Sequence, residues 1–349
     1  MKRANIIAAL AMFVVFVNGA CEKESPPPAL PTQAAPKKKK PAPPTAADPA
    51  KDDPAAPAWL PDPEEIPGWV RSGNVQALVP GEWNRLNNEK LRRCVGAYSI
   101  KTVLTFRYES VLPAPGGAIV EFALCQAAGS TDAFGLATCM MPVQPRDTLV
   151  GSMSALETSE NGQVVYGWQG DYFIHAVSRR LAGPEPRVSV EKLAAALVRP
   201  IPTGEPPRLL AYLPTARRIP GRTWVTCKHL GILPPEVQKQ ALRGSALETT
   251  KSLGLGADTV MAVVAYNPGQ GEAPNYVWLV EYPTHEDAIS ALGRYKNLLR
   301  KIKPMPLVLM DMARDADGKA VGRYLCGTWT ADQESIMNVL PELVGRLPK

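Results

Sequence analysis

The chain has few residues whose types and spacing suit catalysis or metal binding. Its three histidines, His175, His229 and His285, lie far apart in the sequence. The stretch HEDAI (285–289) begins like the zinc-protease signature, but Ile289 stands where the second histidine is required. We therefore expect no metal site, no catalytic triad and no cofactor.

Two glutamates and one histidine remain as candidates for acid–base chemistry. Glu121 and Glu281 are predicted to occupy equivalent strand positions in the two halves of the chain, in the similar patterns Val-Glu-Phe and Val-Glu-Tyr. A carboxylate within an apolar strand can act as an acid or base when burial raises its pKa. Strand alternation instead favours glutamates that face solvent or a neighbouring arginine. In YFIHAVS (172–178), the same alternation predicts that His175 is a partly exposed strand histidine.

The cysteines suggest disulfides if the protein is exported, because disulfides persist in oxidising compartments. We predict one bridge in each half of the chain. Cys125, at a strand end, is predicted to pair with Cys139 in the following helix, and Cys227 with Cys326, both on strands. Cys94 is then left over. The alternative is that all five are small apolar core residues.

The N-terminus predicts export and a lipid anchor. Two basic residues near the start precede an uncharged apolar run (6–17), and the small residues at 19–20 stand directly before Cys21. This pattern is typical of a signal peptide over residues 1–20. The cysteine after the small pair resembles the lipobox of bacterial lipoproteins, whose thiol carries diacylglycerol and whose lipids include palmitate. Asn18 stands where that motif prefers Leu, so an ordinary signal peptide that leaves Cys21 as a plain thiol is the alternative.

Residues 21–57 are predicted to be a lipidated cysteine followed by a disordered stalk. Pro and Ala fill most of this segment, which cannot bury enough apolar area to offset its ordering entropy. At about 3.1 Å per residue in polyproline II, the stalk would reach on the order of 100 Å. The run 37–40 of four lysines either contacts anionic lipids or cell-wall polymers or keeps the stalk solvated. The resemblance to bacterial lipoproteins, whose sorting depends on the residue after the cysteine, implies with Glu22 an outer-membrane location, with the body facing the periplasm or the cell surface.

The charge of the body argues against nucleic-acid binding. Eight of the 39 Lys and Arg and five of the 33 Asp and Glu lie in residues 1–57, which leaves 31 against 28 in the body. So small a surplus is not the basic footprint of a nucleic-acid binder.

The body has an α+β pattern that occurs twice. Residues 118–141 and 277–299 each read as an alternating strand, a polar break and a capped apolar helix. We predict two tandem, similar lobes, 58–203 and 204–349, each a mostly antiparallel sheet with helices packed on one face. Two unrelated α+β domains with similar patterns are the alternative.

Several short motifs resemble an uncharacterised bacterial envelope family, a domain of unknown function whose members are commonly secreted or lipidated. The motifs are IPGW (66–69), TDAFGLA (131–137), LPTARRIPG (213–221) and VEYPTHEDA (280–288). The family's Ile-Asp-Gly element corresponds to RLNNEKL (85–91), which lacks the Asp and the Gly. The resemblance implies an architecture and no activity.

Two kinds of function remain for the body. The first is a membrane-anchored binding or structural module whose lobes, or the cleft between them, hold an envelope protein, a glycan or a small ligand. The alternative is a hydrolase or redox enzyme that uses dispersed carboxylates such as Glu121 and Glu281.

Overall fold

The computed structural model describes most of the chain after residue 56. The described residues are 57, 59–60, 66–111, 119–142, 148, 150–159, 162–179, 185–226, 228–241, 245–267, 273–302, 308–313, 320–329 and 333–348. The predicted signal peptide, Cys21 and the stalk up to residue 56 lie outside them and stay predictions. Every helix in the described part of the chain is too short or too polar to span a bilayer. Both sheets belong to one compact unit, residues 48–349.

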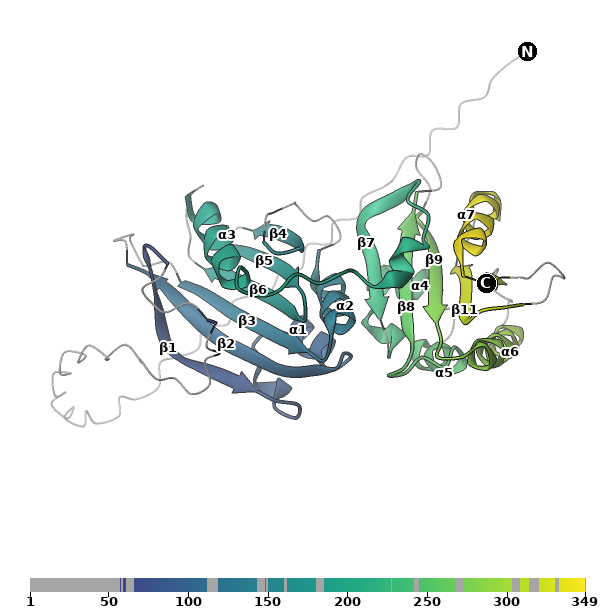
Figure 1. The fold of residues 1–349 in the computed structure, drawn as a ribbon, viewed down its shortest axis with the longest axis horizontal. Coiled ribbons are helices and arrows are strands. Elements are labelled where there is room, and N and C mark those ends of the chain that lie inside the picture. The colour runs from purple at the N-terminus through teal and green to yellow at the C-terminus, as the bar shows by residue number, and fades with distance from the viewer. Residues whose placement is uncertain are drawn as a thin grey trace, which may run out of the picture. The chain divides into compact units, whose positions relative to one another are not determined.

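The first half of the body forms a six-stranded antiparallel sheet, called sheet 1. Its strands follow the order β1-β2-β3-β6-β5-β4, as Figure 1 shows. The strands are β1 (Trp69–Leu78), β2 (Ile100–Ser110), β3 (Ile119–Ala127), β4 (Met153–Ser159), β5 (Gly162–Gln169) and β6 (Tyr172–Arg179).

Helices cover both faces of sheet 1. They are the 3-10 turn η1 (Trp83–Arg85), α1 (Glu89–Val95), α2 (Ser130–Met140) and α3 (Glu185–Val198). On one face, Phe134 of α2 packs edge-on against Trp168 of β5, with ring centroids 5.1 Å apart. On the other face, Leu193 of α3 is buried in a cluster with Val165 and Ile174. The helices α1 and α2 lie on one face of sheet 1, as predicted. The helix α3 lies on the opposite face, where no helix was predicted.

The second half forms a five-stranded antiparallel sheet, called sheet 2, in the order β10-β11-β9-β8-β7. Its strands are β7 (Arg218–Thr226), β8 (Val260–Tyr266), β9 (Asn275–Glu281), β10 (Val308–Asp311) and β11 (Tyr324–Trp329). Its helices are η2 (Arg208–Ala211), η3 (Leu230–Ile232), α4 (Pro235–Ala241), α5 (Ala246–Ser252), α6 (His285–Lys301) and α7 (Gln333–Arg346). The two-lobed α+β fold with antiparallel sheets is therefore confirmed.

The two sheets share a strand order, which supports a duplication. From one edge to the other, the first five strands of sheet 1 are β1-β2-β3-β6-β5, and β4 is an additional strand at the far edge. The five strands of sheet 2 follow the corresponding order β7-β8-β9-β11-β10. The helices that follow β3 and β9 begin at Ser130 and His285, 155 residues apart. Glu121 lies well inside β3, whereas Glu281 is the last residue of β9. An offset of 155 residues therefore does not align the two glutamates. The prediction that the two glutamates occupy equivalent positions is therefore wrong.

The disulfide of sheet 1 joins different cysteines from those predicted. Cys94 of α1 bonds Cys139 of α2, across a Cα–Cα distance of 6.6 Å. Cys125 is a free buried thiol on β3, because α1 packs on the same face of the sheet and brings Cys94 to the end of α2. The predicted bridge between Cys227 and Cys326 is also wrong, since Cys326 is free and buried. Cys227 itself lies outside the described residues.

Side chains of the first half form hydrogen bonds with backbone groups of β7, the edge strand of sheet 2. The hydroxyl of Tyr98 donates to the carbonyl of Val225 at 2.7 Å, and the amide of Val225 donates to Thr138 Oγ1 at 3.1 Å. A Cβ at Gly135 would lie 2.8 Å from the Val225 carbonyl oxygen and 2.4 Å from the Tyr98 ring. Only glycine fits at this contact, which protects an otherwise open sheet edge.

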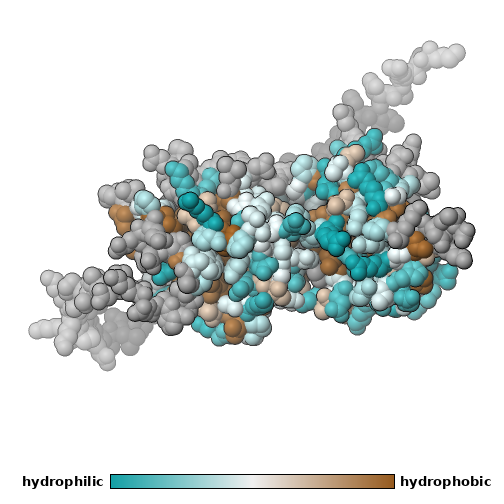
Figure 2. Space-filling view, viewed as in Figure 1, coloured by the Kyte–Doolittle hydropathy of each residue, from teal (hydrophilic) through white to brown (hydrophobic). Residues whose placement is uncertain are grey.

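The described surface carries few large apolar side chains. On the face drawn in Figure 2, apolar residues appear as scattered small groups among polar ones. The exposed large hydrophobic residues are Val70 on β1, Val79 and Val111 just after β1 and β2, Leu247 on α5 and Ile289 on α6. Single exposed apolar residues are ordinary and indicate no docking surface.

Candidate functional site

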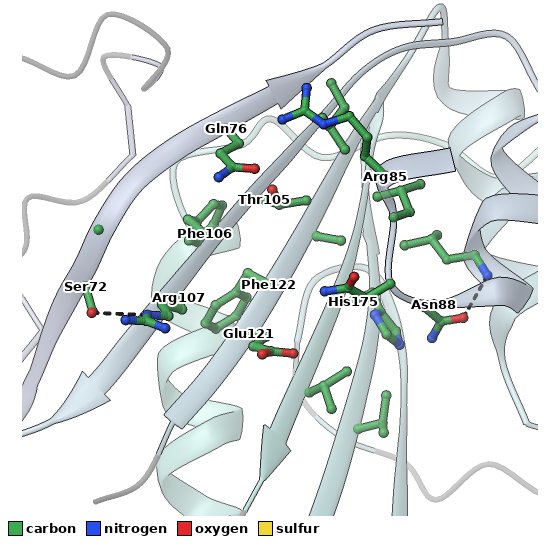
Figure 3. A pocket seen from close by; sticks show the side chains of 18 of the residues that line it. Ser72, Gln76, Arg85, Asn88, Thr105, Phe106, Arg107, Glu121, Phe122 and His175 are labelled. Carbon is green, nitrogen blue, oxygen red and sulfur yellow. Dashed lines mark hydrogen bonds between the residues drawn. The ribbon is translucent and has the colours of Figure 1, made fainter. Parts of the chain in front are cut away.

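A cavity of about 550 Å³ lies on the α1 side of sheet 1. This volume falls within the range of small-molecule sites, about 300–1,000 Å³. Figure 3 shows its side chains rising from neighbouring strands, with Arg85 and Asn88 contributed by the segment that covers them.

One row of side chains across the sheet forms the inner floor of the cavity. The antiparallel register places Gln76 of β1 opposite Thr105 of β2, and Thr105 opposite Ala123 of β3. The row continues through His175 of β6 and Tyr166 of β5. Residues that oppose each other across a sheet share one face, so five strands deliver one continuous surface.

The next row along the strands forms the outer floor. Ser72 of β1 lies opposite Arg107 of β2, which lies opposite Glu121 of β3. Val177 and Val164 complete the row on β6 and β5. Glu121 and His175 therefore sit on adjacent strands, one register step apart diagonally, and they line the same cavity.

Two local features shape the walls. The register of β1 shifts between Ser72 and Gln76, where Gly73 has φ of 75°, and this bulge carries Asn74 into the lining. Asn88 caps α1 by accepting a hydrogen bond from the Leu91 amide at 2.9 Å, which fixes the covering segment. The segment is the stretch 85–91, where the resemblance places the family's Ile-Asp-Gly element.

His175 is the most enclosed polar side chain of the cavity. It is 4% exposed, and it makes no side-chain hydrogen bond to another described residue. Burial, followed by the nearby Lys90 ammonium, lowers the pKa of His175 to about 4, so the ring is neutral near pH 7. The prediction of a partly exposed histidine is wrong, because α1 and the covering segment close this face of the sheet.

The neighbours of His175 are held in a polar arrangement. The Tyr166 ring lies 5.4 Å from the imidazole, and its hydroxyl donates to Glu157 Oε2 at 2.8 Å. The Lys90 ammonium donates to the Met140 carbonyl at 2.7 Å, and partial desolvation of that ammonium lowers its pKa, although the residue as a whole is exposed.

The cations of the cavity already contact carboxylates. Arg85 pairs with Glu82 at 3.1 Å. Arg107 pairs with Glu109 at 3.3 Å and donates from Nε to Ser72 Oγ at 3.1 Å. Glu121, opposite Arg107 in the register, is half-buried. The lining therefore carries charge of both signs and offers no isolated cation to an anion.

Uncharged polar groups remain free. The side chains of Asn74, Gln76, Asn87 and Thr105 line the cavity and make no hydrogen bond to another described residue. Each amide offers a carbonyl acceptor and an NH₂ donor, and the hydroxyl offers both functions. Strand alternation was the available signal for Thr105 and Arg107, but only the register reveals that they share a cavity with Glu121 and His175.

The other sequence candidates lie outside the cavity. Glu281 pairs with Arg323, at the end of β9 in sheet 2. His285 Nδ1 is hydrogen-bonded to the Gly322 carbonyl at 2.7 Å, and His229 Nδ1 accepts from the Gly231 amide at 2.7 Å. Within the described residues, no three His, Cys, Asp or Glu side chains are grouped so that they could hold a metal ion.

Comparisons with known proteins identify no relative. No protein-family model, no curated protein and no solved structure matches the chain.

Proposed function

We propose that this protein is a lipid-anchored lipoprotein of the outer membrane whose folded body binds a small polar ligand in the sheet 1 cavity. The observation that carries the binding function is His175, a buried imidazole without a hydrogen-bond partner among the described residues, which lines a cavity of about 550 Å³. A buried polar group without a partner costs stability, so a ligand that satisfies it gains affinity.

The anchor rests on the sequence around Cys21, and its test is independent of the body. We expect the chain produced in a Gram-negative host to gain the mass of a diacylglyceryl group and an acyl chain and to fractionate with the outer membrane. The Cys21→Ser variant should lose both properties. Identical cleavage and solubility of the two forms would contradict the anchor.

The binding function is tested at the cavity itself. We expect the small-molecule fraction of an envelope extract to shift NMR signals of cavity residues in the full chain. The variant Ala123→Phe places a ring on the floor between Thr105 and His175, and it should lose the response. Asn297→Ala, on the exposed side of α6, is the matched control and should respond like the wild type. The proposed site would be contradicted if the NMR signals shifted equally in the wild type and in Ala123→Phe, or if they did not shift at all.

The enzyme alternative now rests on a smaller set of residues. The two glutamates lie on different sheets, and Glu281 is ion-paired with Arg323. Glu121 and His175 share the cavity, but no described side chain beside them has the geometry of an activated nucleophile. The binding function is the better-supported of the two.

A further inference from the structure

We propose that the ligand of the sheet 1 cavity is an uncharged saccharide, held by the amides of Asn74, Gln76 and Asn87 and by the imidazole of His175. This inference rests on the proposed binding function of the cavity and names the chemical class of its ligand.

The hydrogen-bonding groups of the lining call for a ligand that both donates and accepts. Each of the three amides has one acceptor and one donor group, and a neutral imidazole has one of each. A hydroxyl group is both a donor and an acceptor. The closely spaced hydroxyls of a sugar ring can therefore form hydrogen bonds with both the donors and the acceptors of the lining. Asn74, Gln76 and Asn87 are exposed, so water satisfies their amides in the free protein. Discrimination therefore rests on the buried imidazole of His175, which an analogue without the hydroxyl leaves unpaired.

The charges of the lining argue against an anionic or cationic ligand. Arg85 and Arg107 each contact a carboxylate, and Glu121 faces Arg107 across the strands. Both ion pairs are solvent-exposed, so they compete only weakly with a ligand. A charged ligand would nevertheless lose more hydration free energy on entering the cavity than an uncharged ligand loses. The neutral state of His175 at pH 7 fits the same conclusion.

The cavity also has apolar surface that suits the C–H face of a sugar ring. Leu86 and Leu91 line the covering segment and are buried, and Val164 and Val177 lie on the outer floor. The Tyr166 hydroxyl already donates to Glu157, so its ring, rather than its hydroxyl, is the part left to contact a ligand. A site with a few polar groups on a mixed apolar lining is the usual form of a small-ligand pocket.

Calorimetric titration of the full mature chain in detergent tests the proposal. The neutral probes are maltose, cellobiose and N,N′-diacetylchitobiose, and the charged comparisons are glucuronate and dialanine. We expect at least one neutral disaccharide to bind more tightly than both charged compounds. His175→Phe should weaken that binding about tenfold or more, because it leaves a ligand hydroxyl unpaired at a buried position. Gln76→Leu should weaken it less, because water reaches the exposed position of Gln76.

Two further variants separate recognition from folding. His175→Gln keeps a donor and an acceptor and should bind within a few-fold of the wild type, whereas Asn297→Ala should not change the affinity. Binding that is stronger for glucuronate or dialanine, or insensitive to His175→Phe in a folded variant, would overturn the saccharide assignment. If the envelope extract shifts the cavity signals and no neutral disaccharide binds, the ligand class is wrong and the binding function stands. If neither binds, both proposals fail.

Discussion

His175 is enclosed between the Tyr166 ring and the covering segment that carries Lys90. Its charged form is disfavoured in the native state, because burial and the nearby ammonium both oppose protonation. In an unfolded chain the same imidazole titrates near its ordinary pKa of 6.5. This difference links the stability of the protein to the pH.

We therefore expect the free energy of unfolding to fall as the pH drops from 6.5 to about 4. The unfolded state binds more protons than the native state in that window, so acid favours unfolding, by about 3 kcal/mol for this one group. Urea denaturation of the wild type and of His175→Gln at several pH values measures the effect.

The variant should lose most of this pH dependence, while His285→Gln at the start of α6 should keep it. Equal slopes for the wild type and for His175→Gln would show that the histidine is not held neutral by its surroundings.

The helices α1 and α2 are joined at the element scale by the bond between Cys94 and Cys139, 45 residues apart in sequence. α1 has only seven residues, too few for a stable isolated helix. Its Asn88 cap, its buried Leu91 and the disulfide together hold the covering segment over the cavity. The bond thus supports the wall of the candidate site as well as the core.

Replacing both cysteines, Cys94→Ala with Cys139→Ala, should lower the free energy of unfolding by about 2–4 kcal/mol, because the unfolded chain regains the entropy of the open loop. Urea denaturation with and without reductant measures the loss. Reductant should destabilise the wild type and leave the double variant unchanged. A double variant that still responds to reductant would place the bond on other cysteines, and peptide mapping without reductant would then find it.

The two sheets are coupled, at the scale of the whole molecule, through a contact that admits no side chain at Gly135. The Tyr98 hydroxyl and Thr138 Oγ1 satisfy the carbonyl and the amide of Val225, on the edge of sheet 2. The backbone groups of an exposed edge strand are otherwise available to other chains. This contact makes the stability of each sheet depend on the other.

We expect Gly135→Ala to lower the free energy of unfolding by about 1–3 kcal/mol, because the new methyl group overlaps Tyr98 and the Val225 carbonyl. Calorimetry should also show a broader or divided transition, since the sheets lose their contact. Gly293→Ala is the matched control: a Cβ there meets nothing within 4 Å, and alanine favours the helix. Equal stability of the two variants would show that the contact at Gly135 is loose.

The sequence by itself determined much of the local structure, and it predicts an export signal. Strand alternation and the helix starts at Thr284 and at 130–132 predicted two α+β lobes, because side-chain period and capping are local properties. The apolar run before Cys21 predicted a lipid anchor in the same way.

Only the tertiary structure decided which residues meet. The strand register brought Glu121 to His175 and separated it from Glu281. Because α1 packs beside α2, Cys139 bonds Cys94 and not Cys125, the partner that the sequence predicted. Register and helix placement follow from burying apolar faces against distant elements, and that long-range energy leaves no periodic signal in the sequence.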